Sequence, residues 1–220
     1  MFQVQTHLGN ITSTVGEFES KQKQRGELKD WILSQKATVT DCSLRPSKLR
    51  SDAAKQDIIN MTDLLNLTSQ KRQQLVAELT GPDDNNTEFD QLFDEIEGKI
   101  TSTVVEKQGN QQMIEDYLQK IQDTNTWFDN VIKRADAVDK GSGMSCTQKQ
   151  SVAAELQTEF NDQAPKRLDE VNNVASTILD FVNNLDGQQV EEQVSVLKMH
   201  RFFVIYFIFS SRQLIVERTT

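Results

Sequence analysis

The feature that most constrains the fold of this chain is a long, proline-free stretch from Phe89 to Val138, in which apolar residues recur at alternating steps of four and three. This spacing is the a/d seam of packed α-helices, whereas a half-buried strand would alternate apolar and polar residues at every second position. The stretch is several times longer than an ordinary globular helix. It therefore predicts a coiled coil or a helix that passes from one bundle into the next. A polar interval at Lys107 and Asn110 interrupts the apolar series.

Breaks in the sequence delimit the other expected helices. Residues 41–46 separate a first helix, which ends near Val39, from a second that covers roughly 47–79. The sequence Gly-Pro-Asp-Asp at 81–84 then ends the second helix, because glycine follows the last periodic residue and proline cannot continue the helix. Only three prolines and nine glycines occur in the 220 residues. The predicted fold class is therefore all-α.

The chain also repeats itself at an offset of 95 or 96 positions. This offset aligns Trp31 with Trp127, Lys71-Arg72 with Lys166-Arg167, Met61 with Leu156, and Leu65 with Phe160. Such self-similarity predicts stacked modules. In each module, a helix that bears the tryptophan is followed by a second helix, and a third helix runs without a break into the tryptophan-bearing helix of the next module.

The repeated apolar residues are the candidates for the cores of these modules. A large aromatic side chain at a repeated heptad position is far more often part of a core than a platform for a ligand. We therefore expect each tryptophan to pack between the other two helices of its own module. The predicted core residues are Trp31, Met61, Leu65, Phe93, Ile96, Trp127, Leu156 and Phe160.

The repeat pattern predicts four segments. Residues 1–17 are interpreted as the end of a third helix from a missing upstream module, 18–111 as the first module and 112–193 as the second. Residues 194–220 are interpreted as a tail outside the repeats. The third helix of the second module is expected to be truncated near Gln193, so this module should be incomplete.

Three interpretations of the tail compete, because the composition becomes strongly apolar after Val194. A transmembrane helix needs about twenty apolar residues, and the unbroken run at 202–209 is much shorter. A buried strand would have no other strand with which to pair. We favour translation past a splice donor into an intron, because Gln193-Val194-Ser195 is a frequent product of such a junction.

Composition argues against most binding and catalytic chemistry. The net charge of −9 disfavours binding of nucleic acid or anionic lipid, which requires clustered cations. Cys42 and Cys146 are far apart and belong to no CxxC pair, as expected of reduced cytosolic thiols. His7 and His200 lie at opposite ends, so neither a catalytic triad nor a two-histidine metal site is expected. We predict no enzyme activity, no cofactor, no metal and no small-molecule substrate.

The arrangement resembles the spectrin-repeat family. The resemblance rests on Trp31, Trp127, the heptads and the continuous stretch from Phe89 to Val138, and it covers residues 1 to about 193. With the loop at 44–49, the chain looks most like the repeats of giant actin-associated linkers of the nesprin or muscle-specific type. Dystrophin-like and plakin-like proteins stay open.

This resemblance implies a structural spacer in the cytoplasm, associated with the cytoskeleton. In nesprin-like proteins, such a spacer tethers the actin cytoskeleton to the nuclear envelope. The expected partners are other proteins, whose identity the sequence does not name. The alternative is a membrane-attached coiled-coil protein that is anchored by the apolar run at 202–209.

Overall fold

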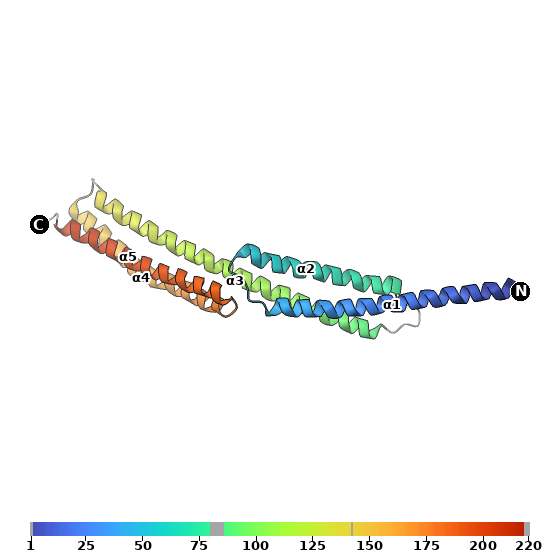
Figure 1. The fold of residues 1–220 in the computed structure, drawn as a ribbon. Coiled ribbons are helices and arrows are strands. Elements are labelled where there is room, and N and C mark those ends of the chain that lie inside the picture. Colours follow the sequence, from blue (N-terminus) through green and yellow to red (C-terminus); the bar gives the residue numbers. More distant parts are fainter. Residues whose placement is uncertain (1, 80–85, 142, 218–220) are drawn as a thin grey trace. The chain divides into compact units, whose positions relative to one another are not determined.

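The computed structural model describes residues 2–79, 86–141 and 143–217 (Figure 1). The helical elements are α1 (Phe2–Leu44), α2 (Ser51–Gln74), the π-helix η1 (Leu75–Leu79), α3 (Thr87–Lys140), α4 (Cys146–Leu179) and α5 (Asn184–Glu217). In the described residues, the one β-type feature is an isolated parallel bridge between Ser47 and Val182. The all-α prediction is confirmed, and the predicted connector is a single helix of 54 residues.

The chain divides into two compact units. Unit 1 comprises Met1–Arg45 and Asp52–Gly109, and unit 2 comprises Pro46–Ser51 and Asn110–Thr220. The division within α3 thus falls between Gly109 and Asn110. The six residues Pro46–Ser51, at the junction of α1 and α2, belong to unit 2, although the sequence places them inside the first module.

Unit 1 has a core built from one face each of α1, α2, η1 and the first half of α3. In α3, the buried side chains follow the predicted spacing of four and three. The core residues are Leu28, Ile32, Val39, Cys42, Met61, Leu75, Leu79, Phe89, Phe93, Ile96 and Ile100. On the rim of this core, Arg72 pairs with Asp94 and Glu97 at 2.7 and 2.9 Å, and its guanidinium lies over the Phe93 ring.

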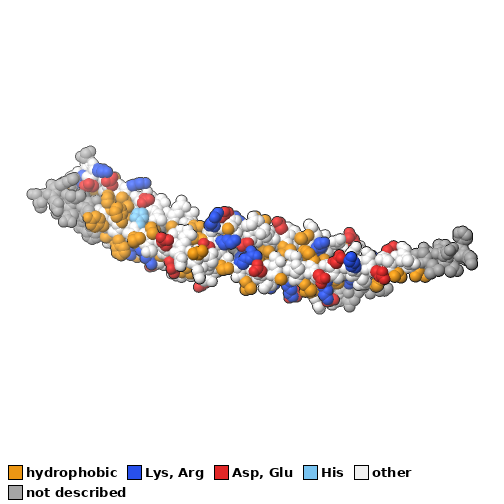
Figure 2. Space-filling view, in the orientation of Figure 1, with side chains coloured by type: hydrophobic (Ala, Val, Ile, Leu, Met, Phe, Trp, Pro, Cys, Tyr) orange, Lys and Arg blue, Asp and Glu red, His pale blue; other side chains and the backbone are white. Residues whose placement is uncertain are grey.

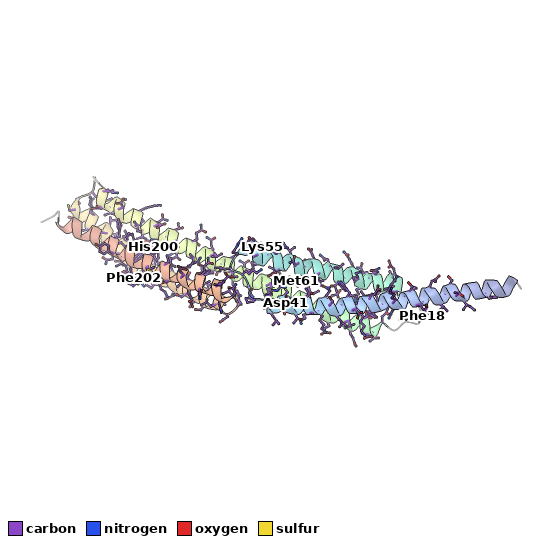
Figure 3. All side chains as sticks on the ribbon, viewed as in Figure 1. Phe18, Asp41, Lys55, Met61, His200 and Phe202 are labelled. Carbon is purple, nitrogen blue, oxygen red and sulfur yellow. The ribbon has the colours of Figure 1, made fainter. Side chains whose placement is uncertain are left out.

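The N-terminal half of α1 carries an apolar series outside this core. Ile11, Val15 and Phe18 keep the heptad spacing, and each side chain is about half exposed or more (Figure 3). A helix in water normally buries such a stripe against another element. Assignment of residues 1–17 to a third helix from an upstream module stays a prediction.

Unit 2 has a core built from the second half of α3, from α4 and from α5. Its buried residues are Leu49, Ile114, Tyr117, Phe128, Val131, Ala135, Leu156, Phe160, Ala164, Leu168, Val171, Ala175, Ile178, Val190, Val194, Leu197, Val204 and Ile208. α4 begins with a capping box, in which the Gln148 N–H donates to Ser145 Oγ and the Ser145 N–H donates to Gln148 Oε1. This exchange satisfies two N–H groups that the first turn would otherwise leave unpaired.

The expectation that the third helix of the second module is truncated near Gln193 is wrong in the structure. α5 runs on to Glu217, and its buried positions continue at steps of four and three or their sum. These positions are Val190, Val194, Leu197, Val204 and Ile208. The origin of residues 194–220 in an intron stays a prediction.

The outer face of α5 explains why the sequence pattern concealed this helix. Opposite the core, α5 exposes a second apolar set, which comprises Val196, Met199, Phe202, Phe203 and Tyr206. Hydrophobic side chains gather beside a histidine in Figure 2, and Figure 3 places His200 and Phe202 on α5. Because both faces are apolar, the helical period is not visible as an alternation of apolar and polar residues.

A pair of substitutions tests the core of unit 1. We expect Phe93→Ala to lower the free energy of unfolding of unit 1 by about 3–5 kcal/mol, because a fully buried aromatic ring is removed. Val105→Ala, at an exposed position of the same helix, should change it by about 0.5 kcal/mol or less. Urea unfolding followed by Trp31 fluorescence in a Trp127→Phe background measures both. Equal effects would contradict the core assignment.

A second pair tests whether α5 continues past Gln193. Val204 is 0% exposed and Tyr206 is 72% exposed. Val204→Asp should lower the free energy of unfolding of unit 2 by about 3–5 kcal/mol, because it places an unpaired charge in the core. Tyr206→Asp should have little effect. If Trp127 fluorescence in a Trp31→Phe background showed no difference between the two variants, the helix would not be packed as described.

Candidate functional site: the joining segment and the helix surfaces

The predicted core residues occupy two kinds of position. Phe93, Ile96 and Met61 are buried in unit 1, and Leu156 and Phe160 are buried in unit 2. Leu65 and both tryptophans are partly buried and pack against the edges of these cores. At the edge of unit 2, the Trp127 ring stacks on the Phe160 ring with a centroid distance of 5.4 Å, and the Arg167 guanidinium covers the Trp127 ring.

Sequence reasoning missed the two largest buried side chains of α3 in unit 2, Tyr117 and Phe128. The missed signal was the register of α3. Its buried positions run at strict steps of four and three from Phe89 to Tyr117, through Ile100 and across Lys107 and Asn110. The polar interval therefore lies within the seam and does not interrupt it.

Tyr117 brings a polar group into the core of unit 2. Its hydroxyl lies 3.2 Å from the Val190 carbonyl oxygen and 3.0 Å from Gln193 Oε1, both of which accept hydrogen bonds. Burial disfavours the charged phenolate and raises the pKa of Tyr117 to about 12. The phenol therefore stays protonated at neutral pH and joins α3 to α5 as a hydrogen-bond donor.

The residue types that carry catalysis do not converge on one site in the described part of the chain. Cys42 is buried in unit 1, where burial raises the pKa of its thiol and the nearby Asp57 carboxylate raises it further. His200 lies in unit 2, with Nδ1 3.1 Å from Asn125 Oδ1 and Nε2 3.6 Å from Asp129 Oδ1. Among the described residues, no group of three or more His, Cys, Asp and Glu side chains is placed to hold a metal ion.

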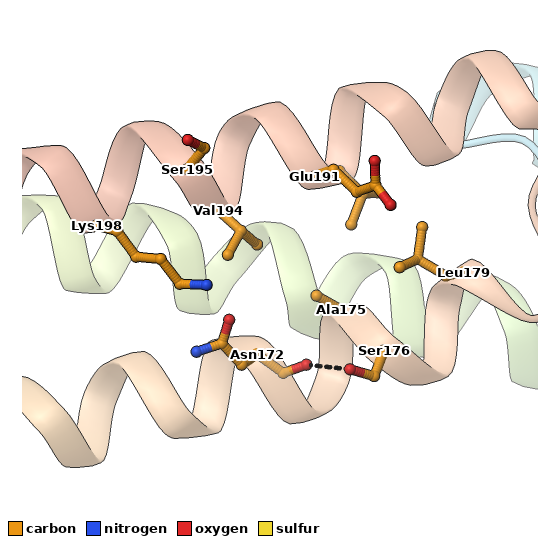
Figure 4. A pocket seen from close by; sticks show the side chains of 9 residues that line it. Asn172, Ala175, Ser176, Leu179, Glu191, Val194, Ser195 and Lys198 are labelled. Atoms are coloured by element: carbon orange, nitrogen blue, oxygen red, sulfur yellow. Dashed lines mark hydrogen bonds between the residues drawn. The ribbon is translucent and has the colours of Figure 1, made fainter.

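Each unit has a shallow groove between two helices. The groove of unit 2 has a volume of about 270 Å³ and lies between α4 and α5, where the small side chains of Ala175, Ser176 and Ser195 leave room (Figure 4). The groove of unit 1 has a volume of about 320 Å³, and Trp31 and Lys71 are among its lining residues. Neither lining includes a histidine or a cysteine.

The most specific polar structure in unit 2 surrounds Pro46–Ser51, which are the five residues before α2 and the first residue of α2, here called the joining segment. Leu49 is 4% exposed and belongs to the core of unit 2. The Ser47 N–H donates to the Phe181 carbonyl at 2.8 Å, and the Leu49 N–H donates to Asp186 Oδ2 at 3.0 Å. The joining segment therefore packs on the connection between α4 and α5.

The acceptor that receives the Leu49 N–H is held in place by a second residue. Asn183 Nδ2 donates to Asp186 Oδ2 at 2.9 Å. Asn183 Oδ1 in turn accepts from the N–H groups of Leu185 and Asp186, both at 2.9 Å. Asn183 thus caps the start of α5 and orients the carboxylate toward the joining segment.

Two polar residues at heptad positions of α3, Lys107 and Asn110, form hydrogen bonds with the chain at and just before the joining segment. Asn110 Nδ2 donates to Ser47 Oγ at 3.1 Å, and both side chains are buried in unit 2. In unit 1, Lys107 Nζ donates to the Arg45 carbonyl. A buried polar group is costly unless it is hydrogen-bonded, so these partners account for the burial of Lys107 and Asn110 in the seam.

Comparisons with known proteins add a relative. The chain is similar to the Muscle-specific protein 300 kDa of Drosophila melanogaster. The two are 42% identical over 196 residues, which are 89% of this chain and 2% of the relative. This match confirms the predicted resemblance to a muscle-specific protein. No family model matches the chain, and no solved structure matches it.

The buried phenol predicts a loss of stability at high pH. Because the pKa of Tyr117 is raised from 10.0 to about 12 in the folded state, the folded state holds this proton more tightly than the unfolded state. This difference in pKa contributes to the free energy of unfolding on the order of 2–3 kcal/mol. The contribution is present below pH 10 and is lost as the pH rises through about 12. Urea unfolding of unit 2 at pH 9 to 12 measures this loss. Tyr117→Phe should flatten it, and an unchanged slope would contradict the assignment.

Proposed function

We propose that this chain is a non-enzymatic structural segment of a cytoskeletal linker protein. The observation that carries the proposal is the unbroken seam of α3, whose buried positions run from Phe89 to Val138 and contribute to the cores of both units. Each compact unit therefore takes part of its core from the same helix, as in stacked helical repeats. Such a chain is suited to act as a spacer and to present helix faces to other proteins.

The proposed partners are cytoskeletal or nuclear-envelope proteins. The segment would help to tether the actin cytoskeleton to the nuclear envelope or to other structures. The similarity to a muscle-specific protein supports a place in the cytoplasm of contractile cells. The net charge of −9 favours protein partners over nucleic acid. We propose no small-molecule substrate and no cofactor, because the potentially reactive side chains described above lie in different units and outside both grooves.

Membrane attachment forms no part of this proposal. In the described ranges, no helix is long and apolar enough to cross a bilayer. The apolar run at 202–209 lies within α5, where Val204 and Ile208 face the core of unit 2.

Retention on the cytoskeleton tests the proposal. A tagged full chain expressed in cultured muscle cells should stay with the detergent-insoluble cytoskeleton, whereas the tag alone should be extracted. The matched control combines Phe93→Ala with Val204→Asp, which disrupts both cores and should abolish retention. Extraction of the intact chain to the same extent as the tag would contradict the proposal. Retention that survives depolymerisation of actin would exclude actin as the tether.

A further inference from the structure

The internal repeat allows the surroundings of the two tryptophans to be compared. In unit 2, the Arg167 guanidinium lies over the Trp127 ring, 4.9 Å from its centroid. The repeat that aligns Trp31 with Trp127 also aligns Arg72 with Arg167. In the part of unit 1 that the structure describes, however, neither a cation nor an aromatic ring lies over the Trp31 ring. The equivalent tryptophans therefore differ in what covers them.

Three carboxylates explain why Arg72 lies elsewhere. Asp90, Asp94 and Glu97 share one face of α3, because they are spaced by four and three positions. All three pair with the Arg72 guanidinium, at 3.4, 2.7 and 2.9 Å in that order. Among the described residues, Arg167 takes part in no ion pair. Charge-assisted hydrogen bonds are stronger than the contact of a cation with a ring. The acidic face of α3 therefore leaves the tryptophan of unit 1 uncovered.

The uncovered ring lines the groove of unit 1. This groove has a volume of about 320 Å³, and its lining includes Trp31 and Glu27 of α1, Lys71 of α2 and Leu79 of η1. The buried Leu28 and Leu79 are its apolar lining residues beside the tryptophan. Part of the Trp31 side chain packs against the core, and another part is reached from the groove. The groove thus combines an aromatic ring, apolar side chains and a charged rim.

The negative charge at this rim comes from Glu27. Its ion pair with Lys23 is long, at 3.8 Å, and both side chains are mostly exposed. Such a pair contributes little in water, so the carboxylate can accept another cation. The sequence of unit 1 contains 17 Asp and Glu residues against 11 Lys and Arg residues. Charge complementarity therefore favours a basic occupant.

The positive charge at the rim comes from Lys71. The repeat aligns it with Lys166, which stands next to Arg167 in the sequence and pairs with Asp162 at 2.8 Å. A lysine beside a ring-covering arginine is therefore compatible with this arrangement in unit 2. The residue four positions before Lys71 is a leucine, so α2 offers no equivalent carboxylate there. A guanidinium in the groove of unit 1 therefore fits best on the side of Glu27.

We propose that the groove of unit 1 is a docking site for an arginine side chain of a basic partner protein. The guanidinium would take the place over Trp31 that Arg167 takes over Trp127, and Glu27 would accept its N–H groups. Tryptophan is the best aromatic ring for a cation, and a flat guanidinium is less strongly hydrated than an ammonium. In unit 2, Arg167 already fills the equivalent place. This site does not depend on the cytoskeletal function proposed above.

The test follows the two indole N–H signals of the full chain by NMR. A blocked Ala-Arg-Ala peptide is the probe, and Trp31→Phe assigns the signals. The peptide should shift the Trp31 signal with saturation and leave the Trp127 signal nearly unchanged. The same peptide with glutamine in place of arginine should bind about fivefold more weakly. Absence of a saturable shift at Trp31, or equal shifts at both indoles, would overturn the proposal.

Charge variants at the rim decide which kind of side chain the groove accepts. Glu27→Gln should weaken binding of the arginine peptide about threefold, and Lys71→Gln should strengthen it by a similar factor. Glu19→Gln is the matched control, because Glu19 is an exposed residue of α1 outside the groove, and it should change nothing. The opposite signs, together with tighter binding of a peptide with glutamate in place of arginine, would show a carboxylate site and overturn the proposal.

A last variant opens the equivalent place in unit 2. Arg167→Ala removes the guanidinium that covers Trp127, so the arginine peptide should then shift the Trp127 indole signal as well. The dispersion of the two indole signals shows in the same spectrum that both units are folded. If Trp127 did not respond in this folded variant, an uncovered tryptophan of the repeat would not be a platform for arginine, and the proposal would be overturned.

Discussion

The register of α3 is the constraint on which the rest of the structure depends. Its seam positions, all buried except the partly buried Ile121, recur every 3.5 residues on average from Phe89 to Val138, and they contribute to both hydrophobic cores. Seven residues occupy slightly less than two full turns of a straight α-helix, so a strict heptad seam stays turned toward its neighbours when packed helices wind around one another. The helices α1 and α2 bury their apolar faces against the first part of this seam, and α4 and α5 against the second.

The polar residues within the seam decide where the joining segment lies. Lys107 and Asn110 occupy heptad positions that would otherwise be apolar, and burial without partners would be costly. Their partners are the Arg45 carbonyl and Ser47 Oγ, at the end of α1 and the start of the joining segment. Lys107 and Asn110 therefore find their hydrogen-bond acceptors in a short stretch of chain about sixty residues earlier. This pairing explains why the seam can be polar there without a break in the helix.

Burial in the cores also explains the perturbed side chains of the described residues, among which no reaction centre is evident. Tyr117 and Cys42 have raised pKa values mainly because they are buried. Such shifts are typical of a packed core as well as of an active site. The surface is instead composed of helix faces, among which the outer face of α5 is unusually apolar. These features agree with the similarity to a muscle-specific protein, of which this chain corresponds to 2%.

By itself, the sequence determined the helical class, the single long helix and five buried core residues, Met61, Phe93, Ile96, Leu156 and Phe160, since heptad spacing and the scarcity of proline are local properties. It did not reveal the continuation of α5, because residues on both faces of that helix are apolar and the period is hidden. It placed the tryptophans at the centre, whereas Tyr117 and Phe128 are fully buried and the tryptophans lie at the edges. Only the tertiary structure decided that Leu49 belongs to unit 2, because its partner Asp186 is 137 positions away and no local pattern records so distant a contact.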